Sequence, residues 1–143
     1  MLAVAGTKGG CGKTTTAIGI AEAFARADVP AVAVDADRQL PNVHVIGDVD
    51  REPTLAKIDE GDAVSDVAAR SPRESNAQLL PAPLSSETVP FESTLSRVAD
   101  APARAVIDCP SGAGPDGVEP LSVADRAIVV TTDAKRSIEG ARV

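Results

Sequence analysis

The residues with the clearest chemical potential form a glycine-rich run near the N-terminus, Lys8-Gly9-Gly10-Cys11-Gly12-Lys13-Thr14-Thr15. Glycines let a backbone turn tightly and approach a phosphate group closely, and successive backbone N–H groups at the start of a helix attract anions. In such loops a lysine reaches the β- and γ-phosphates of a nucleotide and a threonine hydroxyl can bind Mg²⁺. The run therefore predicts a phosphate-binding loop, with Lys13 on the phosphates and Thr14 on the metal.

This run differs from the common phosphate-binding pattern G-x-x-x-x-G-K-[ST] at one position. Five residues separate Gly6 from Gly12, whereas the pattern has four residues between its two glycines. The Gly12-Lys13-Thr14 core is kept, between an apolar run and a helical pattern. A glycine-rich turn with a surface lysine is the structural alternative.

Acidic residues follow two other apolar runs. Asp35 and Asp37 come after residues 31–34, and Asp108 comes after residues 103–107. Carboxylates in such places hold metal ions, directly or through water, and orient an attacking water. Asp is also a common turn and cap residue, and this is the alternative for the first pair.

Hydrophobic periodicity outlines the elements that must position these residues. Apolar runs predict strands over residues 2–6, 31–34, 76–80, 103–107 and 126–132. Helical spacing predicts helices over residues 13–27 and 91–100, with shorter ones over 54–58 and 62–70, and the start of one over 137–143. Proline, glycine and serine predict loops over residues 84–90 and 112–120.

Alternating strands and helices predict an α/β fold, with a doubly wound, mainly parallel sheet flanked by helices. The first strand–helix–strand unit predicts a parallel pair of strands. Residues 1–143 are expected to form a single nucleotide-binding domain. In such sheets ligands bind beyond the carboxyl ends of the strands. The loops over residues 6–15, 35–42 and 108–114 all follow strands, so we expect them to share one site.

The glycine-rich run resembles the deviant Walker A signature K-G-G-x-G-K-[ST] of the MinD/ParA superfamily of P-loop ATPases, whose extra lysine falls at Lys8. Asp35-Ala36-Asp37-Arg38-Gln39-Leu40-Pro41-Asn42 is similar to that family's switch I. Asp108 ends a Walker B-like strand, and Cys109-Pro110-Ser111-Gly112 resembles switch II, with Cys109 where Ser or Thr is common.

The resemblance implies ATP and Mg²⁺ as cofactors and a role for each matching residue. Lys8 would act across an ATP-sandwiched dimer on the partner's nucleotide, or else be a solvated loop lysine. Asp37 would activate the attacking water. Thr14, Asp35 and Asp108 would hold the metal. Residues expected to contact the nucleotide are Gly9, Gly10, Cys11, Gly12, Lys13, Thr14, Thr15 and Gly112.

The function implied by the resemblance is a MinD-like ATPase that works as a dimerisation switch in the spatial organisation of a cellular structure. The strand ending in Thr131-Thr132 favours MinD over ParA, whereas Gln39 favours ParA-like segregation ATPases. A non-catalytic nucleotide-binding or scaffold module is a further alternative. An iron–sulfur carrier of the same superfamily is disfavoured, because Cys11 and Cys109 form no CxxC pair.

The composition of the chain limits the classes of molecule that it is expected to bind. The net charge is −7 with no basic run, which argues against direct binding of nucleic acid or anionic lipid. The composition, poor in Lys and rich in Asp, Ala and Val, resembles that of proteins from salt-loving archaea. The alternative is that it reflects a high-GC genome. No apolar run reaches the roughly 18 residues of a membrane span. Cys11 and Cys109 are expected to be reduced thiols, the usual state in a cytosolic protein, so a cytoplasmic location is expected.

The superfamily normally continues for two or more further strands and helices. These add adenine contacts and, in many MinD proteins, an amphipathic helix that binds the membrane. We therefore expect this chain, as a fragment or a naturally short member, to lack C-terminal strands of the fold. Phosphate and Mg²⁺ binding would be encoded in it, and peripheral membrane attachment would depend on a segment that it does not contain.

Overall fold

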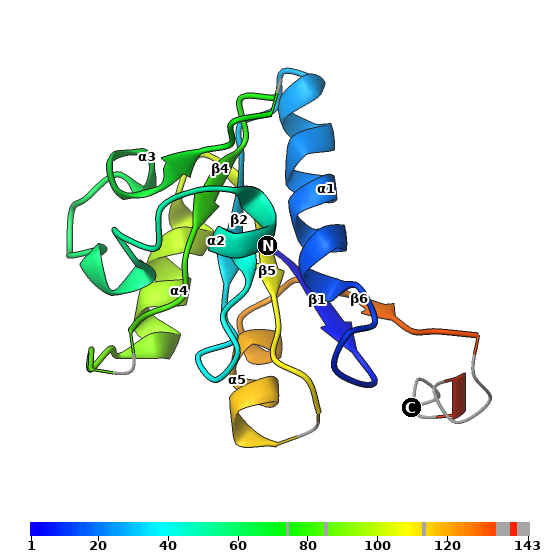
Figure 1. Ribbon diagram of the computed structural model, residues 1–143. Coiled ribbons are helices and arrows are strands. Elements are labelled where there is room, and N and C mark those ends of the chain that lie inside the picture. The colour runs from blue at the N-terminus through cyan, green and yellow to red at the C-terminus, as the bar shows by residue number, and fades with distance from the viewer. Residues whose placement is uncertain (74, 85, 113, 134–137, 140–143) are drawn as a thin grey trace.

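A mostly parallel sheet forms the centre of the molecule (Figure 1). The computed structural model describes residues 1–73, 75–84, 86–112, 114–133 and 138–139. In that part of the chain the sheet has six strands in the order β3-β4-β2-β5-β1-β6. The strands are β1 (Leu2–Gly6), β2 (Ala31–Asp35), β3 (Ala69–Arg70), β4 (Gln78–Leu80), β5 (Arg104–Asp108) and β6 (Arg126–Val130). The helices are α1 (Lys13–Arg26), α2 (Val43–Gly47), the 3-10 turn η1 (Leu55–Lys57), α3 (Val64–Val67), α4 (Phe91–Asp100) and α5 (Pro115–Ser122).

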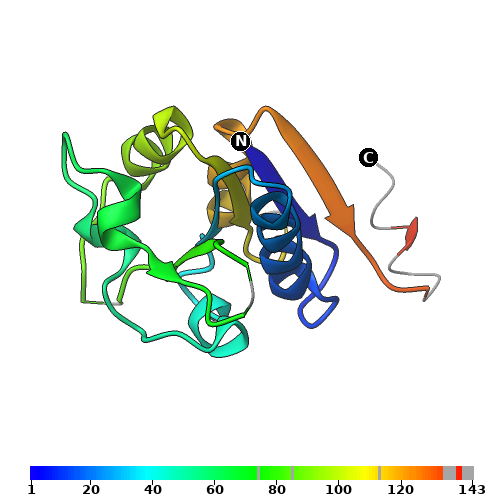
Figure 2. The ribbon, with the colours of Figure 1, turned by 90° about the horizontal axis from the view of Figure 1, so that it is seen from above.

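Helices cover both faces of this sheet (Figure 2). Each face has its own apolar core. Neighbouring residues of one strand point to opposite faces, so Val32 packs beneath α4 while Ala33 packs against α1. The α1 side buries Val4, Ile18, Ala21, Leu79 and Val106. The α4 side buries Val34, Leu80, Leu95, Val98 and Ile107. The predicted α/β fold with a doubly wound, mainly parallel sheet is thereby confirmed.

The first strand–helix–strand unit is parallel, but its two strands are not neighbours. Strand β5 lies between β1 and β2 and pairs in parallel with both. The predicted parallel pair is therefore correct in strand direction, but β1 and β2 do not pair with each other. The inserted strand brings Asp108 next to Asp35 in register, at the carboxyl ends of their strands.

Two short elements differ from expectation because tertiary partners determine them. Residues 69–70, predicted within a helix, pair antiparallel with β4. Residues 43–47, for which no element was predicted, form α2. Its first N–H groups, from Asn42 and Val43, donate to Asp35 Oδ2 at 2.9 and 3.0 Å. A buried carboxylate from the preceding strand therefore serves as the acceptor at this helix N-terminus.

The loop predicted over residues 112–120 is wrong from Pro115 onward, where α5 begins. Proline suits the first helical position, where its missing N–H costs nothing, and the helix continues through Pro120 to Ser122. The predicted strand over residues 126–132 is confirmed in its core as β6. Of the helix predicted over residues 137–143, only residues 138–139 are among the described residues. No helix in the described part of the chain is long and apolar enough to cross a membrane.

Candidate functional site

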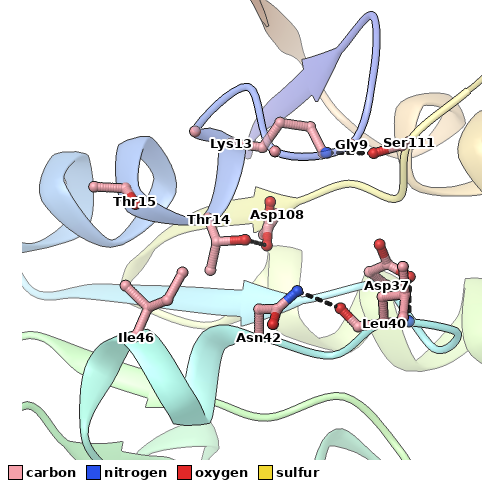
Figure 3. A pocket seen from close by; sticks show the side chains of 12 residues that line it. Gly9, Lys13, Thr14, Thr15, Asp37, Leu40, Asn42, Ile46, Asp108 and Ser111 are labelled. Atoms are coloured by element: carbon pink, nitrogen blue, oxygen red, sulfur yellow. Dashed lines mark hydrogen bonds between the residues drawn. The ribbon is translucent and has the colours of Figure 1, made fainter.

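Three loops meet around a cavity of about 310 Å³ beyond the carboxyl ends of β1, β2 and β5 (Figure 3). These are the three strand-following loops in which the sequence analysis placed candidate residues. The cavity is lined by Gly9, Gly10, Gly12, Lys13, Thr14, Thr15, Asp37, Leu40, Asn42, Ile46, Asp108 and Ser111. The expectation that the three loops share one site is therefore met by the geometry.

The glycine-rich loop depends on its glycines for conformation and for space. Gly10 and Gly12 have φ angles of +73° and +97°, in the left-handed region that side chains disfavour. At Gly6, a Cβ atom would lie 2.6 Å from Cys11 Sγ and 2.7 Å from Lys13 Cδ. The close packing at Gly6 holds the lysine stem against the end of β1.

Lys13 is the first residue of α1, and its side chain is almost fully buried. Its Nζ donates to the Oγ of Ser111, which lies in the loop after β5, at 2.6 Å (Figure 3). An ammonium group held at a helix N-terminus beside glycine N–H groups is a strong site for an anion. The geometry therefore suits phosphate.

Thr14 and Asp108 form the second pair in the cavity. Thr14 Oγ1 donates to Asp108 Oδ2 at 2.5 Å. Asp108 is buried, and its Oδ1 has no hydrogen-bond partner among the described residues. Burial, the largest cause, raises the pKa of Asp108 to about 7; the Thr14 hydroxyl opposes the rise and Asp35 adds to it. A buried carboxylate with an unused oxygen beside a hydroxyl fits a divalent cation.

Asp35 does not line the cavity. Its side chain is fully buried and accepts N–H groups from Asp37 at 3.0 Å, besides those of Asn42 and Val43. Burial raises the pKa of Asp35 to about 6, and the three backbone donors oppose that rise. In the structure Asp35 stabilises the loop after β2 through these hydrogen bonds. Its predicted metal-binding role stays a prediction.

Asp37 lies on the cavity wall and is half-buried. Its Oδ1 accepts the N–H groups of Gln39 at 3.1 Å and of Leu40 at 2.9 Å, closing a turn. Asp37 therefore does act as a turn residue, which was the alternative to a catalytic role. The same turn places its carboxylate in the cavity lined by the glycine-rich loop.

Besides Asp35, three predicted residues lie outside the cavity lining. Lys8 is exposed, and Cys11 is partly buried. Gly112 is exposed with φ of +97°, so it allows the turn after Ser111. Cys109 is buried, and burial raises the pKa of its thiol to about 12, which argues against thiolate chemistry there.

Sequence reasoning missed four lining residues. Ser111 stood within the switch II-like run, and a hydroxyl facing a loop after a Walker B-like strand was a usable signal. Leu40 and Asn42 stood within the switch I-like run, although nothing in the sequence singled out their side chains. Ile46 gave no signal, because α2 depends on the buried Asp35.

Known proteins are similar to this chain in sequence and in fold. An uncharacterised ATP-binding protein of Methanocaldococcus jannaschii is 31% identical over 148 aligned residues, covering 98% of this chain and 55% of that protein. The chloroplastic septum site-determining protein MinD homologue of Arabidopsis thaliana is 30% identical over 139 residues, covering 87% of this chain and 43% of that protein. The solved structure of the septum site-determining protein MinD from Pyrococcus horikoshii, complexed with Mg-ADP, superimposes with a TM-score of 0.80 at 22% identity. That match covers 97% of this chain and 60% of the other.

The chain spans about half the length of the curated relatives it matches. Residues 2–140 match the family described as the CobQ/CobB/MinD/ParA nucleotide binding domain. This match includes every residue of the cavity. The chain belongs to that family, which confirms the resemblance to MinD and ParA proteins indicated by its phosphate-binding loop.

Proposed function

We propose that this chain is the phosphate- and metal-binding part of a MinD-like ATPase, in which ATP promotes dimerisation and hydrolysis reverses it. The observation that carries the proposal is the convergence of Lys13, Thr14, Asp108 and Ser111 on one cavity. Lysine, hydroxyl and carboxylate together match the needs of a nucleotide phosphate with its cation.

The residues present fit Mg²⁺. Thr14 Oγ1 and the Asp108 carboxylate can both serve as oxygen ligands, and they are in contact with each other. Asp108 Oδ1 is buried with no partner in the described structure. Protein sites for Mg²⁺ in nucleotide enzymes use one or two such ligands, with phosphates and water completing the shell. When bound there, Mg²⁺ supplies positive charge that neutralises the phosphate oxygens. The relative from Pyrococcus horikoshii, complexed with Mg-ADP, supports this assignment.

In this proposal, Asp37 orients the water that attacks the γ-phosphate, and its position on the cavity wall supports that role. Lys8 acts on the nucleotide of a second protomer. Its exposure, and its absence from the lining of its own cavity, support an action in trans. Such a cation stabilises the charge that develops on the transferring phosphoryl group.

Equilibrium binding of ATP and ADP with Mg²⁺, with mass followed by light scattering, tests the proposal. We expect Lys13→Ala to weaken ATP binding about 10- to 100-fold, because it removes a charge-assisted contact with phosphate. Lys8→Ala should keep binding but lose the ATP-dependent dimer, and lower turnover on the order of 10³-fold.

Lys57→Ala is the matched control, since Lys57 is exposed, pairs with Glu87 and lies outside the cavity. If neither nucleotide binds to the folded wild-type protein, the proposal is wrong. If ATP binds without dimerisation or turnover, the non-catalytic nucleotide-binding module is the correct alternative.

A further inference from the structure

Asp116 in helix α5 contacts two residues of the loop that carries Asp37. Arg38 Nη2 donates to Asp116 Oδ1 at 3.1 Å, and Gln39 Nε2 donates to Asp116 Oδ2 at 2.9 Å. Both carboxylate oxygens are therefore engaged by consecutive residues of the loop. A carboxylate held at two points restricts rotation as well as distance.

Arg38 extends this attachment to two further groups. Its Nη2 lies 3.6 Å from Glu119 Oε2, one helical turn beyond Asp116. Its guanidinium carbon lies 4.8 Å from the centroid of the Phe91 ring at the start of α4. The side chain thus joins the loop to α5 and α4 by charge and by cation–π contact.

Asp37 is adjacent to these anchors in sequence and bonded to one of them. Its Oδ1 accepts the N–H of Gln39, whose side chain holds Asp116. At the inner side of the loop, the buried Asp35 accepts the N–H groups of Asp37 and Asn42. The inner anchor is buried in the fold, whereas the outer anchor is exposed: 39% for Arg38 and 48% for Asp116.

The same helix follows the loop that contains Ser111, the partner of Lys13. Gly117, in the first turns of α5, packs so closely that a Cβ there would lie 2.5 Å from the carbonyl oxygen of Gly112. A displacement of the 109–112 segment would therefore push on α5, and Asp116 would transmit it to the loop of Asp37.

We propose that Asp116, acting through Arg38 and Gln39, is a positioning residue that sets Asp37 for hydrolysis according to the position of the Ser111 loop. The inference rests on the proposed ATPase function. Asp116 does not line the 310 Å³ cavity, so its effect should fall on kcat and leave nucleotide binding unchanged.

Steady-state ATPase kinetics of the protein test this. We expect Asp116→Ala to lower kcat about fivefold, with KM for ATP and the affinity for ADP unchanged within about twofold. A single exposed ion pair contributes little. Here several contacts hold the same loop, so their combined loss should lower kcat measurably. Arg38→Gln, which keeps a stem over Phe91, should lower kcat similarly, and the double variant should lose no more than either single variant.

Asp100→Ala is the control, since Asp100 is exposed at the end of α4 and outside this network. Circular dichroism and ADP affinity establish that each variant is folded. An unchanged kcat in Asp116→Ala, or fully additive losses in the double variant, overturns the positioning role. Loss of nucleotide binding in Asp116→Ala also overturns it, because the residue then serves the fold of the site. Absence of turnover in the wild-type protein refutes the proposed ATPase function itself, and the positioning role with it.

Discussion

Asp108 lies in an environment where an ionised carboxylate is costly to the metal-free fold. Its pKa, ordinarily 3.8, is raised to about 7, mainly by burial. Between about pH 4 and pH 7 the unfolded chain has therefore released this proton while the folded chain still holds it. Stability from this group is fully present below pH 4 and is lost as pH rises to 7. Burial also raises the pKa of Asp35, to about 6, so this group changes the stability in the same direction.

We therefore predict that Asp108→Asn stabilises the metal-free protein at pH 8, by on the order of 2 kcal/mol. The amide avoids the buried charge and can still accept from Thr14. The advantage should shrink as the pH falls towards 4. Urea unfolding in EDTA from pH 4 to pH 8 measures this, with Asp100→Asn as control. Destabilisation of Asp108→Asn that grows from pH 4 to pH 8 would show instead that the ionised carboxylate stabilises the fold.

At the scale of elements, α1 and α5 contain glycines in opposite situations. Gly19 in α1 has nothing within 4 Å of a Cβ position, whereas Gly117 in α5 faces the Gly112 carbonyl oxygen at 2.5 Å. Alanine in an open helical position restricts the unfolded chain and favours the helix. Alanine against a backbone carbonyl must displace it.

We predict that Gly19→Ala raises the free energy of unfolding by about 0.5–1 kcal/mol. Gly117→Ala should lower it by about 1–3 kcal/mol. The two substitutions are chemically identical, so each controls for the other in urea denaturation. Equal stabilisation by both would mean that α5 does not press on the loop after β5.

At the scale of the whole molecule, the acidic surface sets the response to salt. A net charge of −7 on 143 residues produces self-repulsion in the compact state, which dissolved ions screen. The nucleotide cavity is also the place where a further polyanion must enter. Screening should therefore favour both folding and nucleotide association.

We predict that the thermal unfolding midpoint rises as KCl is increased from about 0.1 M to about 1 M, over which the screening length falls from about 10 to 3 Å. A variant with Glu60→Gln, Glu92→Gln and Asp100→Asn, all at exposed positions, should gain less from the same salt. A midpoint that falls with KCl, or equal gains in both proteins, would contradict the charge explanation.

The sequence by itself determined the parts of the molecule governed by local patterns. The Gly12-Lys13-Thr14 core begins a helix after an apolar strand, and the strand that ends in Asp108 lies where predicted. Glycine conformation, helical spacing and the alternation of strands and helices are properties of consecutive residues. They were enough to predict the fold class and the edge of the sheet that contains the cavity.

Only the tertiary structure decided the contacts between segments distant in the chain. It placed β5 between β1 and β2, which sets Asp108 beside Asp35. It turned Asp35 into the acceptor that starts α2, and it made Ser111 the partner of Lys13. Each of these depends on strand order and on a buried acceptor far away in sequence. The free energy that selects them comes from packing and desolvation across the fold, so local sequence patterns do not contain it.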